Sequence, residues 1–200
     1  MSGPGPLGEA VAAARAGALI VFPTDTVYGI AARADIPSAT SRLFQAKSRP
    51  RDLSLPVLAA STAEAQIVAQ FDARADRLAA ACWPGGLTLV LPRTVRSRDW
   101  DLGGDAASIG VRVPAHPLAL AVLAQTGPLA TTSANRSGAP PATTCDDLVA
   151  SFGDDVEVYL CQDEPLTGAA STVVSLLGPA LDIVRVGALD PATIERLSAG

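Results

Sequence analysis

One lysine stands among the fifteen basic residues of this 200-residue chain. It is Lys47, in the stretch KSRPRD at 47–52, which also holds Arg49 and Arg51. An extended segment would point these alternating side chains to one side, and Pro50 would stiffen it. Arginine offers a bidentate fork for phosphate or carboxylate, and lysine offers a compact charge. The stretch therefore predicts an anion site that suits a triphosphate; a solvated surface cluster is the alternative.

Three further polar stretches lie where predicted strands begin or end: PTDTVYG at 23–29, TTSANRSG at 131–138 and STVV at 171–174. Ligands of sheet proteins gather at such strand ends. The hydroxyl, amide and glycine residues of TTSANRSG allow donors to approach a phosphate or an amino-acid carboxylate. Ordinary turns are the alternative for each stretch, because Thr, Ser, Asn, Gly and Pro are the usual turn residues.

Several kinds of site are not expected. The chain has no GxxxxGK[ST] motif and no GxGxxG after a strand, which argues against a P-loop and a dinucleotide cofactor. Cys82, Cys145 and Cys161 are widely spaced, lack a CxxC and have one histidine beside them, so we expect no metal site and reduced, mostly buried thiols. His116 precedes Pro117, which favours helix entry over catalysis.

Composition excludes other classes of protein. A net charge of -5 and 4% aromatic residues argue against a protein whose main task is to hold a nucleic-acid backbone. The longest apolar stretches, 18–22 and 118–124, are far shorter than the ~20 residues that span a bilayer. MSGPGPLGEA at 1–10 has no features of a signal segment, so we expect no membrane and a cytoplasmic location.

Helical and extended apolar patterns alternate along the chain, without an internal repeat or a linker. We expect one α/β domain over residues 1–200, with mixed strand directions. Thr144 and Asp147 have the spacing of a helix capping box. The predicted helices are 7–17, 38–47, segments near 62–81, 116–126, 145–151 and 191–198. The predicted strands are 18–23, 55–60, 87–92, 109–114, 127–133, 156–160, 171–177 and 181–186.

Seven segments together resemble the YrdC/Sua5 family of threonylcarbamoyl-AMP synthases, from about residue 10 to residue 190. The resemblance implies a YrdC-like twisted mixed sheet, flanked by helices and carrying a cationic cleft, in the short single-domain form. It also implies that L-threonine, bicarbonate and ATP give L-threonylcarbamoyladenylate and pyrophosphate. The product would pass to a tRNA threonylcarbamoyl transferase for t6A37 modification, with at most weak direct tRNA binding. The segments are PTDTVYGIAARAD, KSRPRD, WPGGLTLVLPR, IGVRVPAHPLA, TTSANRSG, STVV and VRVGAL.

The resemblance also implies roles for individual residues. A K-x-R pair, Lys47 and Arg49, would be catalytic. Together with an S-x-N pair, Ser133 and Asn135, it would mark the active site. ATP would be a substrate, with Mg²⁺, and no cofactor would be bound to the protein. The implied ATP contacts are Arg49, Ser108, Asn135, Thr143 and Arg185, and the implied threonine contacts are Thr26, Arg112, Ser133 and Ser171.

The implied chemistry fits these residue types. A threonine carbamate would attack the α-phosphorus of ATP in line, and fixed cations would screen the repulsion between the two anions. The carbamate is already anionic, so positioning matters more than a general base. Because a carbamate decomposes in water, we expect the loop after Asn135 to cover the site. The alternatives are an RNA-binding or ribosome-associated module and a paralogue that acts on another small acid.

Overall fold

A large mixed sheet organises the computed structural model, which describes residues 5–166 and 168–199. Within these residues the strand order is β7-β1-β2-β6-β3-β5-β4-β8-β9. The pairs β1–β7, β3–β5 and β4–β8 are parallel, and the other neighbours are antiparallel, as the expected mixed directions require. The strands are β1 (Ile20–Phe22), β2 (Gly29–Arg33), β3 (Val57–Leu58), β4 (Leu87–Pro92), β5 (Ser108–Arg112), β6 (Leu129–Ser133), β7 (Val158–Tyr159), β8 (Thr172–Ser175) and β9 (Asp182–Arg185).

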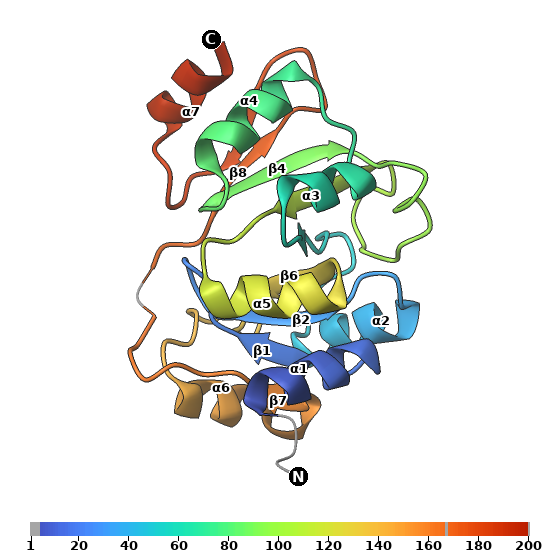
Figure 1. Cartoon of the computed structure of the whole chain (residues 1–200), viewed down its shortest axis with the longest axis vertical. Coiled ribbons are helices and arrows are strands. Elements are labelled where there is room, and N and C mark those ends of the chain that lie inside the picture. The colour runs from blue at the N-terminus through green and yellow to red at the C-terminus, as the bar shows by residue number, and fades with distance from the viewer. Residues whose placement is uncertain (1–4, 167, 200) are drawn as a thin grey trace.

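Helices flank this sheet. In Figure 1, α1 and α5 lie side by side near β1 and β2, while α4 and α7 pack together at the opposite end of the molecule. None of the helices in the described ranges has the length and apolar character needed to cross a membrane. The helices are α1 (Pro6–Arg15), α2 (Pro37–Ala46), α3 (Thr62–Val68), α4 (Ala73–Cys82), α5 (Pro117–Thr126), α6 (Cys145–Phe152), the 3₁₀ turn η1 (Gly153–Asp155) and α7 (Pro191–Ala199).

The sheet has an apolar core on each face. Along β1, Val21 belongs to the larger core, whereas its neighbours Ile20 and Phe22 belong to the smaller core beneath α1 and α5. Ile30 and Ala31 of β2 divide in the same way. Successive side chains of a strand point to opposite faces, so a strand covered on both faces reads as a continuous apolar run. This explains why ALIVF contains no polar residue.

Most predicted elements are confirmed, with ends that differ by a few residues. His116 is the residue before α5, and Pro117 is the first residue of that helix. The Thr144 hydroxyl accepts the backbone N–H of Asp147 and donates to its carboxylate, as the capping-box spacing predicts. The region 62–81 divides into α3 and α4, because the Asp72 carboxylate caps a new helix.

The sequence prediction missed β2. The run GIAAR consists mainly of glycine and alanine, which have low strand propensity, so it carries no strand pattern of its own. Pairing with β1 and β6 on its two sides makes it a central strand. Glycine is needed at position 29, because a Cβ there would lie 2.8 Å from Thr131 Cγ2.

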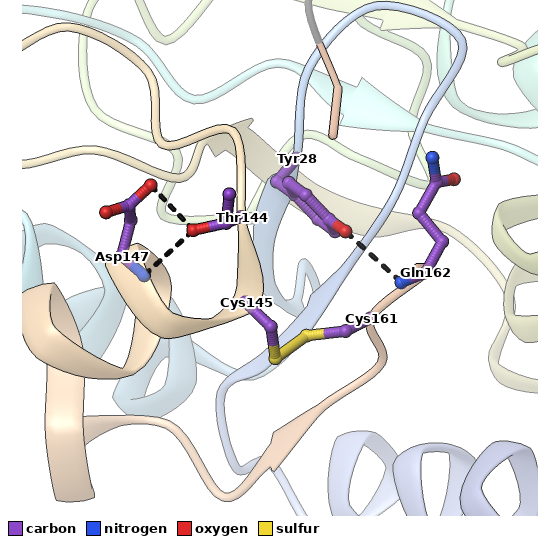
Figure 2. The surroundings of a disulfide bond; sticks show 6 residues. All are labelled: Tyr28, Thr144, Cys145, Asp147, Cys161 and Gln162. Carbon is purple, nitrogen blue, oxygen red and sulfur yellow. Dashed lines mark hydrogen bonds between the residues drawn. A yellow bond between two sulfur atoms is a disulfide. The ribbon is translucent and has the colours of Figure 1, made fainter. Parts of the chain in front are cut away.

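The prediction of reduced, mostly buried thiols is wrong. Cys145 and Cys161 form a disulfide with their Cα atoms 5.7 Å apart, and Cys82 is the free cysteine of the described residues. All three side chains are only half-buried. The two bonded cysteines are 16 residues apart in sequence, and only the fold shows that the start of α6 lies beside the segment after β7 (Figure 2).

Candidate active site

A cavity of about 150 Å³ opens at one edge of the sheet. There β5, β6 and β9 end, and β2 and β8 begin. The volume is below the roughly 300 Å³ at which pockets begin to bury drug-sized ligands, so the cavity suits a ligand the size of an amino acid. A nucleotide would have to extend beyond it. Six of the residues predicted from sequence line the cavity: Thr26, Arg49, Arg112, Ser133, Ser171 and Arg185.

Arg112 is the buried cation of this cavity, and its side chain is only 7% exposed. It donates from Nη2 to the Asp25 carboxylate at 2.6 Å and from Nη1 to the Thr26 hydroxyl at 2.9 Å. Burial lowers the pKa of Arg112, and the negative charge of Asp25 opposes that shift. The Asp25 carboxylate therefore allows a guanidinium to stay charged in an enclosed position.

Arg49 and Arg185 bring two further positive charges to the cavity. Partial burial lowers the pKa of both, and the charge of Arg185 lowers that of Arg49 further. Within the described ranges neither forms an ion pair. They donate instead to backbone carbonyls, Arg49 to Leu53 and Ser54 and Arg185 to Ser171. Two repelling cations without an acid between them favour binding of an anion such as carboxylate or phosphate.

Hydroxyl groups complete the polar wall of the cavity. The Thr24 and Thr26 hydroxyls lie 3.0 Å apart, and the Ser171 hydroxyl lies 2.8 Å from that of Thr88. Arg185 Nη2 also donates to the Ser171 hydroxyl at 3.1 Å. These mutual bonds hold the groups in fixed directions before any ligand arrives, which reduces the cost of ordering them on binding.

The side chains of Lys47 and Arg49, at the end of α2, point in different directions. The Arg49 N–H bonds to Phe44 O and the Ser48 N–H to Gln45 O, the pattern of a Schellman motif. Ser48 takes the left-handed conformation of that motif, with φ 49°. Because the chain reverses here, the stretch is not extended as the sequence predicted, and neighbouring cations do not share one side.

Lys47 is buried behind the cavity wall and does not line the cavity. Its Nζ donates to Ser133 O at 2.5 Å, to Asn135 O and, at 3.4 Å, to Asn135 Oδ1. The Ser133 hydroxyl in turn lies 2.6 Å from Asn135 Oδ1. The K-x-R and S-x-N pairs, 86 residues apart in sequence, are thus in direct contact, and Lys47 holds the backbone that presents Ser133 to the cavity.

Arg51 does not join the other cations, and its predicted convergence with them is wrong. Its guanidinium donates to the Asp101 carboxylate at 2.6 Å and to the Ser41 hydroxyl at 3.0 Å. It also lies over the Phe44 ring, 4.6 Å from the centroid. The turn after α2 directs this side chain to the outer surface, where it already has an acid partner.

Two residues implied as ATP contacts lie away from this cavity. Ser108 begins β5 and Arg112 ends it, a separation of about 13 Å at the usual strand rise. Thr143 lies beside Cys145 and Gln162 on a separate groove of about 140 Å³. The cavity, Ser108 and Thr143 therefore do not form one enclosed pocket, and the roles of these two residues stay predictions.

Sequence reasoning missed Asp25 and Thr88. Asp25 lies within PTDTVYG, but an acid was not expected in an anion site. Its role is to pair with the buried Arg112, which is four strands away along the chain. Thr88 alternates with apolar residues in β4, where nothing marks it as more than a core residue. Neither could be recognised without the strand pairing.

The described residues contain no group of three or more His, Cys, Asp or Glu side chains arranged to hold a metal ion. The donor set of the cavity is cationic and hydroxylic, which does not fit a resident divalent cation. Any Mg²⁺ would therefore reach the site together with a nucleotide.

Comparison with known proteins places this geometry in a family. Residues 12–187 match the family model Sua5/YciO/YrdC, described as "Telomere recombination". The chain belongs to this family. Its matching part includes the cavity, the Lys47 contacts and the disulfide.

Two family members are similar over most of the chain. A Mycobacterium tuberculosis protein named "Putative threonylcarbamoyl-AMP synthase" is 41% identical over 192 residues, covering 95% of this chain and 86% of that protein. The threonylcarbamoyl-AMP synthase of Pyrococcus abyssi is 36% identical over 185 residues, covering 92% of this chain and 54% of that protein. The chain therefore spans nearly all of the first relative and about half of the second.

A solved family structure has the same fold. The crystal structure of P. abyssi Sua5 complexed with L-threonine superposes with a TM-score of 0.85 and 34% identity, covering 94% of this chain and 56% of that one. The predicted YrdC-like sheet and helices are confirmed by this match. The chain corresponds to slightly more than half of the Sua5 structure.

The Asp25–Arg112 pair should contribute more to stability than a surface pair. We expect Asp25→Ala to lower the free energy of unfolding by about 3 kcal/mol, because it leaves a buried guanidinium without a partner. Asp35→Ala is the matched control, since it breaks the more exposed Arg33–Asp35 pair and should cost ~1 kcal/mol or less. Chemical denaturation measures both; equal losses would contradict the role given to Asp25.

The ammonium of Lys47 can be titrated directly, because it is the only lysine of the chain. Burial, and then the charge of Arg49, lower the pKa of Lys47 from 10.5 to about 8. Selective ¹³C labelling of lysine should give one NMR signal with a midpoint near pH 8 in the folded protein. Between that value and the unfolded pKa the unfolded chain binds more protons, so this group makes stability rise with pH there. A midpoint near 10 in the folded protein would contradict the lowered pKa of Lys47.

Proposed function

We propose that this chain is a threonylcarbamoyl-AMP synthase, an enzyme of the nucleotidyltransferase class. It converts L-threonine, bicarbonate and ATP to L-threonylcarbamoyladenylate and pyrophosphate. The observation that carries the proposal is the convergence of Arg49, Arg112 and Arg185 on one amino-acid-sized cavity with a hydroxyl-lined wall. The names of the similar proteins and the L-threonine complex of Sua5 support the choice of substrate.

L-threonine fits the inner part of the cavity. Its carboxylate would pair with Arg112, the buried cation, and its hydroxyl would bond to the polar groups of Thr26, Ser133 and Ser171. These four residues line the cavity together. The charge-assisted bonds fix the amino group in one direction, so that the carbamate formed with bicarbonate is held for in-line attack.

ATP would occupy the open side of the cavity. Arg49 and Arg185 would contact its phosphates and screen the repulsion between the carbamate and the α-phosphate, with Asn135 beside them. Ser108 and Thr143 would then contact parts of the nucleotide that extend beyond the cavity. Mg²⁺ would arrive on the phosphates of ATP and neutralise part of their charge.

Lys47 serves this reaction as a positioning residue. Its three oxygen contacts, to Ser133 and Asn135, keep the S-x-N turn closed against the cavity. The loop after Asn135 remains the proposed cover of the site; its backbone is tied back through bonds from Asn135 Nδ2 to Arg136 O and Ala139 O. A cover there would keep water from the carbamate.

The rest of the proposal concerns the setting of the reaction. We place one catalytic domain over residues 1–200 in the cytoplasm, where a tRNA threonylcarbamoyl transferase would take up the product. The net charge of -5 makes direct tRNA binding by this chain weak.

The two arginines of KSRPRD give a matched pair of variants. Arg49→Met should reduce pyrophosphate release by roughly 10- to 100-fold, the equivalent of one lost charge-assisted contact of about 1.5–3 kcal/mol. Arg51→Met should change it by less than about threefold, because Arg51 contacts Asp101 outside the cavity. The assay contains ATP, bicarbonate and L-threonine and identifies the adenylate by mass. Equal effects of both variants would refute the assignment of Arg49.

The same assay separates the alternatives. A panel of amino acids in place of L-threonine should show one strong substrate, and preference for another acid would identify a paralogue with different specificity. RNA affinity at two salt concentrations tests the RNA-binding reading, which requires tight and steeply salt-dependent binding. Such binding without adenylate formation would overturn the proposed function.

A further inference from the structure

The Cys145–Cys161 disulfide joins two segments that border the site from different parts of the chain. Cys145 is the first residue of α6, and Cys161 follows β7 (Figure 2). Neither cysteine lines the cavity. The bond is therefore not part of the reacting surface, and its effect must act through the segments that it connects.

One of these segments carries Thr143. The chain from 136 to 141 is exposed, and Thr143 is fixed mainly by the bond from Leu166 N–H to its carbonyl at 3.0 Å. Thr144 caps α6 and so stays with that helix rather than with the sheet. Arg136 and Ser137 tie the start of the segment to carbonyls of Ser151, Ala46 and Lys47, so the disulfide mainly holds its end, at residues 142–144.

The other segment reaches the cavity wall. Next to Cys161, the Gln162 N–H donates to the Tyr28 hydroxyl at 3.2 Å, and Gln162 Oε1 lies 3.1 Å from His116 Nε2. Tyr28 is buried and lines the cavity. The covalent link therefore runs from the Thr143 segment through Cys145 and Cys161 to a residue that contacts a wall of the site.

The disulfide is also open to small reagents. Both cysteines are half-buried, and Cys145 lines the groove of about 140 Å³ together with Thr143 and Gln162. The bond lies at the weak end of the sheet, since β7 has two residues and pairs only with β1 among the described strands. Reduction there would leave the central strands in place.

We propose that Cys145 and Cys161 form a reversible thiol–disulfide site that holds Thr143 in position for nucleotide binding. A dithiol reductant attacks one sulfur through its thiolate, forms a mixed disulfide and then closes its own S–S bond. Two electrons and two protons pass to the protein, and two cysteine thiols result. Reduction loosens residues 142–144, next to Cys145, and weakens nucleotide binding. The proposal rests on the proposed function for the identity of the ligand and for the contact between Thr143 and the nucleotide.

Titration of a non-hydrolysable ATP analogue tests it. The oxidised full chain should bind the analogue about tenfold more tightly than the same protein reduced with dithiothreitol, and removal of the reductant under air should restore tight binding. L-threonine affinity should change by less than about twofold, because its proposed contacts are held by bonds of their own, Arg112 to Thr26, Ser133 to Asn135 and Ser171 to Thr88. Alkylation and mass measurement before and after reduction report the state of the cysteines.

Variants separate the disulfide from other thiol effects. Cys82→Ser should respond to reductant like the parent protein, because Cys82 is on α4, away from the linked segments. The Cys145→Ser, Cys161→Ser double variant should stay at the weak affinity with or without reductant. Circular dichroism checks that it is folded; if it is not, the comparison of oxidised and reduced parent protein decides.

Hydrogen–deuterium exchange provides a readout that needs no ligand. Amides from 142 to 148, which include the first turn of α6, should exchange faster in the reduced protein, while those of β2 and β6 stay unchanged. If neither form binds the analogue, the proposed function fails, and this exchange comparison alone decides the redox proposal. Equal exchange in both forms, or free thiols at both positions after oxidation, would overturn it.

Discussion

The ammonium group of Lys47 joins the two segments from which the site is built. It is enclosed by oxygen atoms of Ser133 and Asn135, and these residues come from the far end of β6. Hydrogen bonds to a charged donor contribute about 1.5–3 kcal/mol each, and a buried carbonyl without a donor is costly. The ammonium directs its donors from a single nitrogen atom, and the oxygen atoms of Ser133 and Asn135 gather around that one point. This geometry gives a physical reason for the single lysine of an arginine-rich set.

The charge of the cavity follows from the same arrangement. Because Lys47 is occupied by backbone oxygens, the cations that face the open space are arginines. Asp25 neutralises the deepest one, Arg112, and leaves the outer two unpaired. In a chain of net charge -5 the field is thus positive only locally. The positive charge that faces the cavity is thus confined to three arginine side chains among its lining residues.

The sequence allowed the order of elements, the helix starts at Pro117 and Cys145, and the nearness of Lys47 to Asn135 to be predicted. These features depend on local periodicity, capping residues and motif order, which a linear pattern contains. The sequence did not reveal strand β2, the outward direction of the Arg51 side chain or the disulfide. Each of these is decided by tertiary contacts: strand neighbours for an Ala-rich run, a left-handed residue at Ser48, and a return of the chain beside α6. The placement of Asp25 opposite Arg112 is also decided by tertiary structure, because it depends on the register of the strands.

Because the chain reverses at Ser48, the K-x-R-x-R spacing determines in which direction each basic side chain points. One basic side chain goes inward to the backbone, the next to the open space and the third to the outer surface. Inserting or deleting a single uncharged residue between them would exchange these destinations while leaving the net charge and the number of basic residues unaltered. Divergent relatives are therefore better compared by the interval between the basic residues and the helix end than by how many such residues they contain.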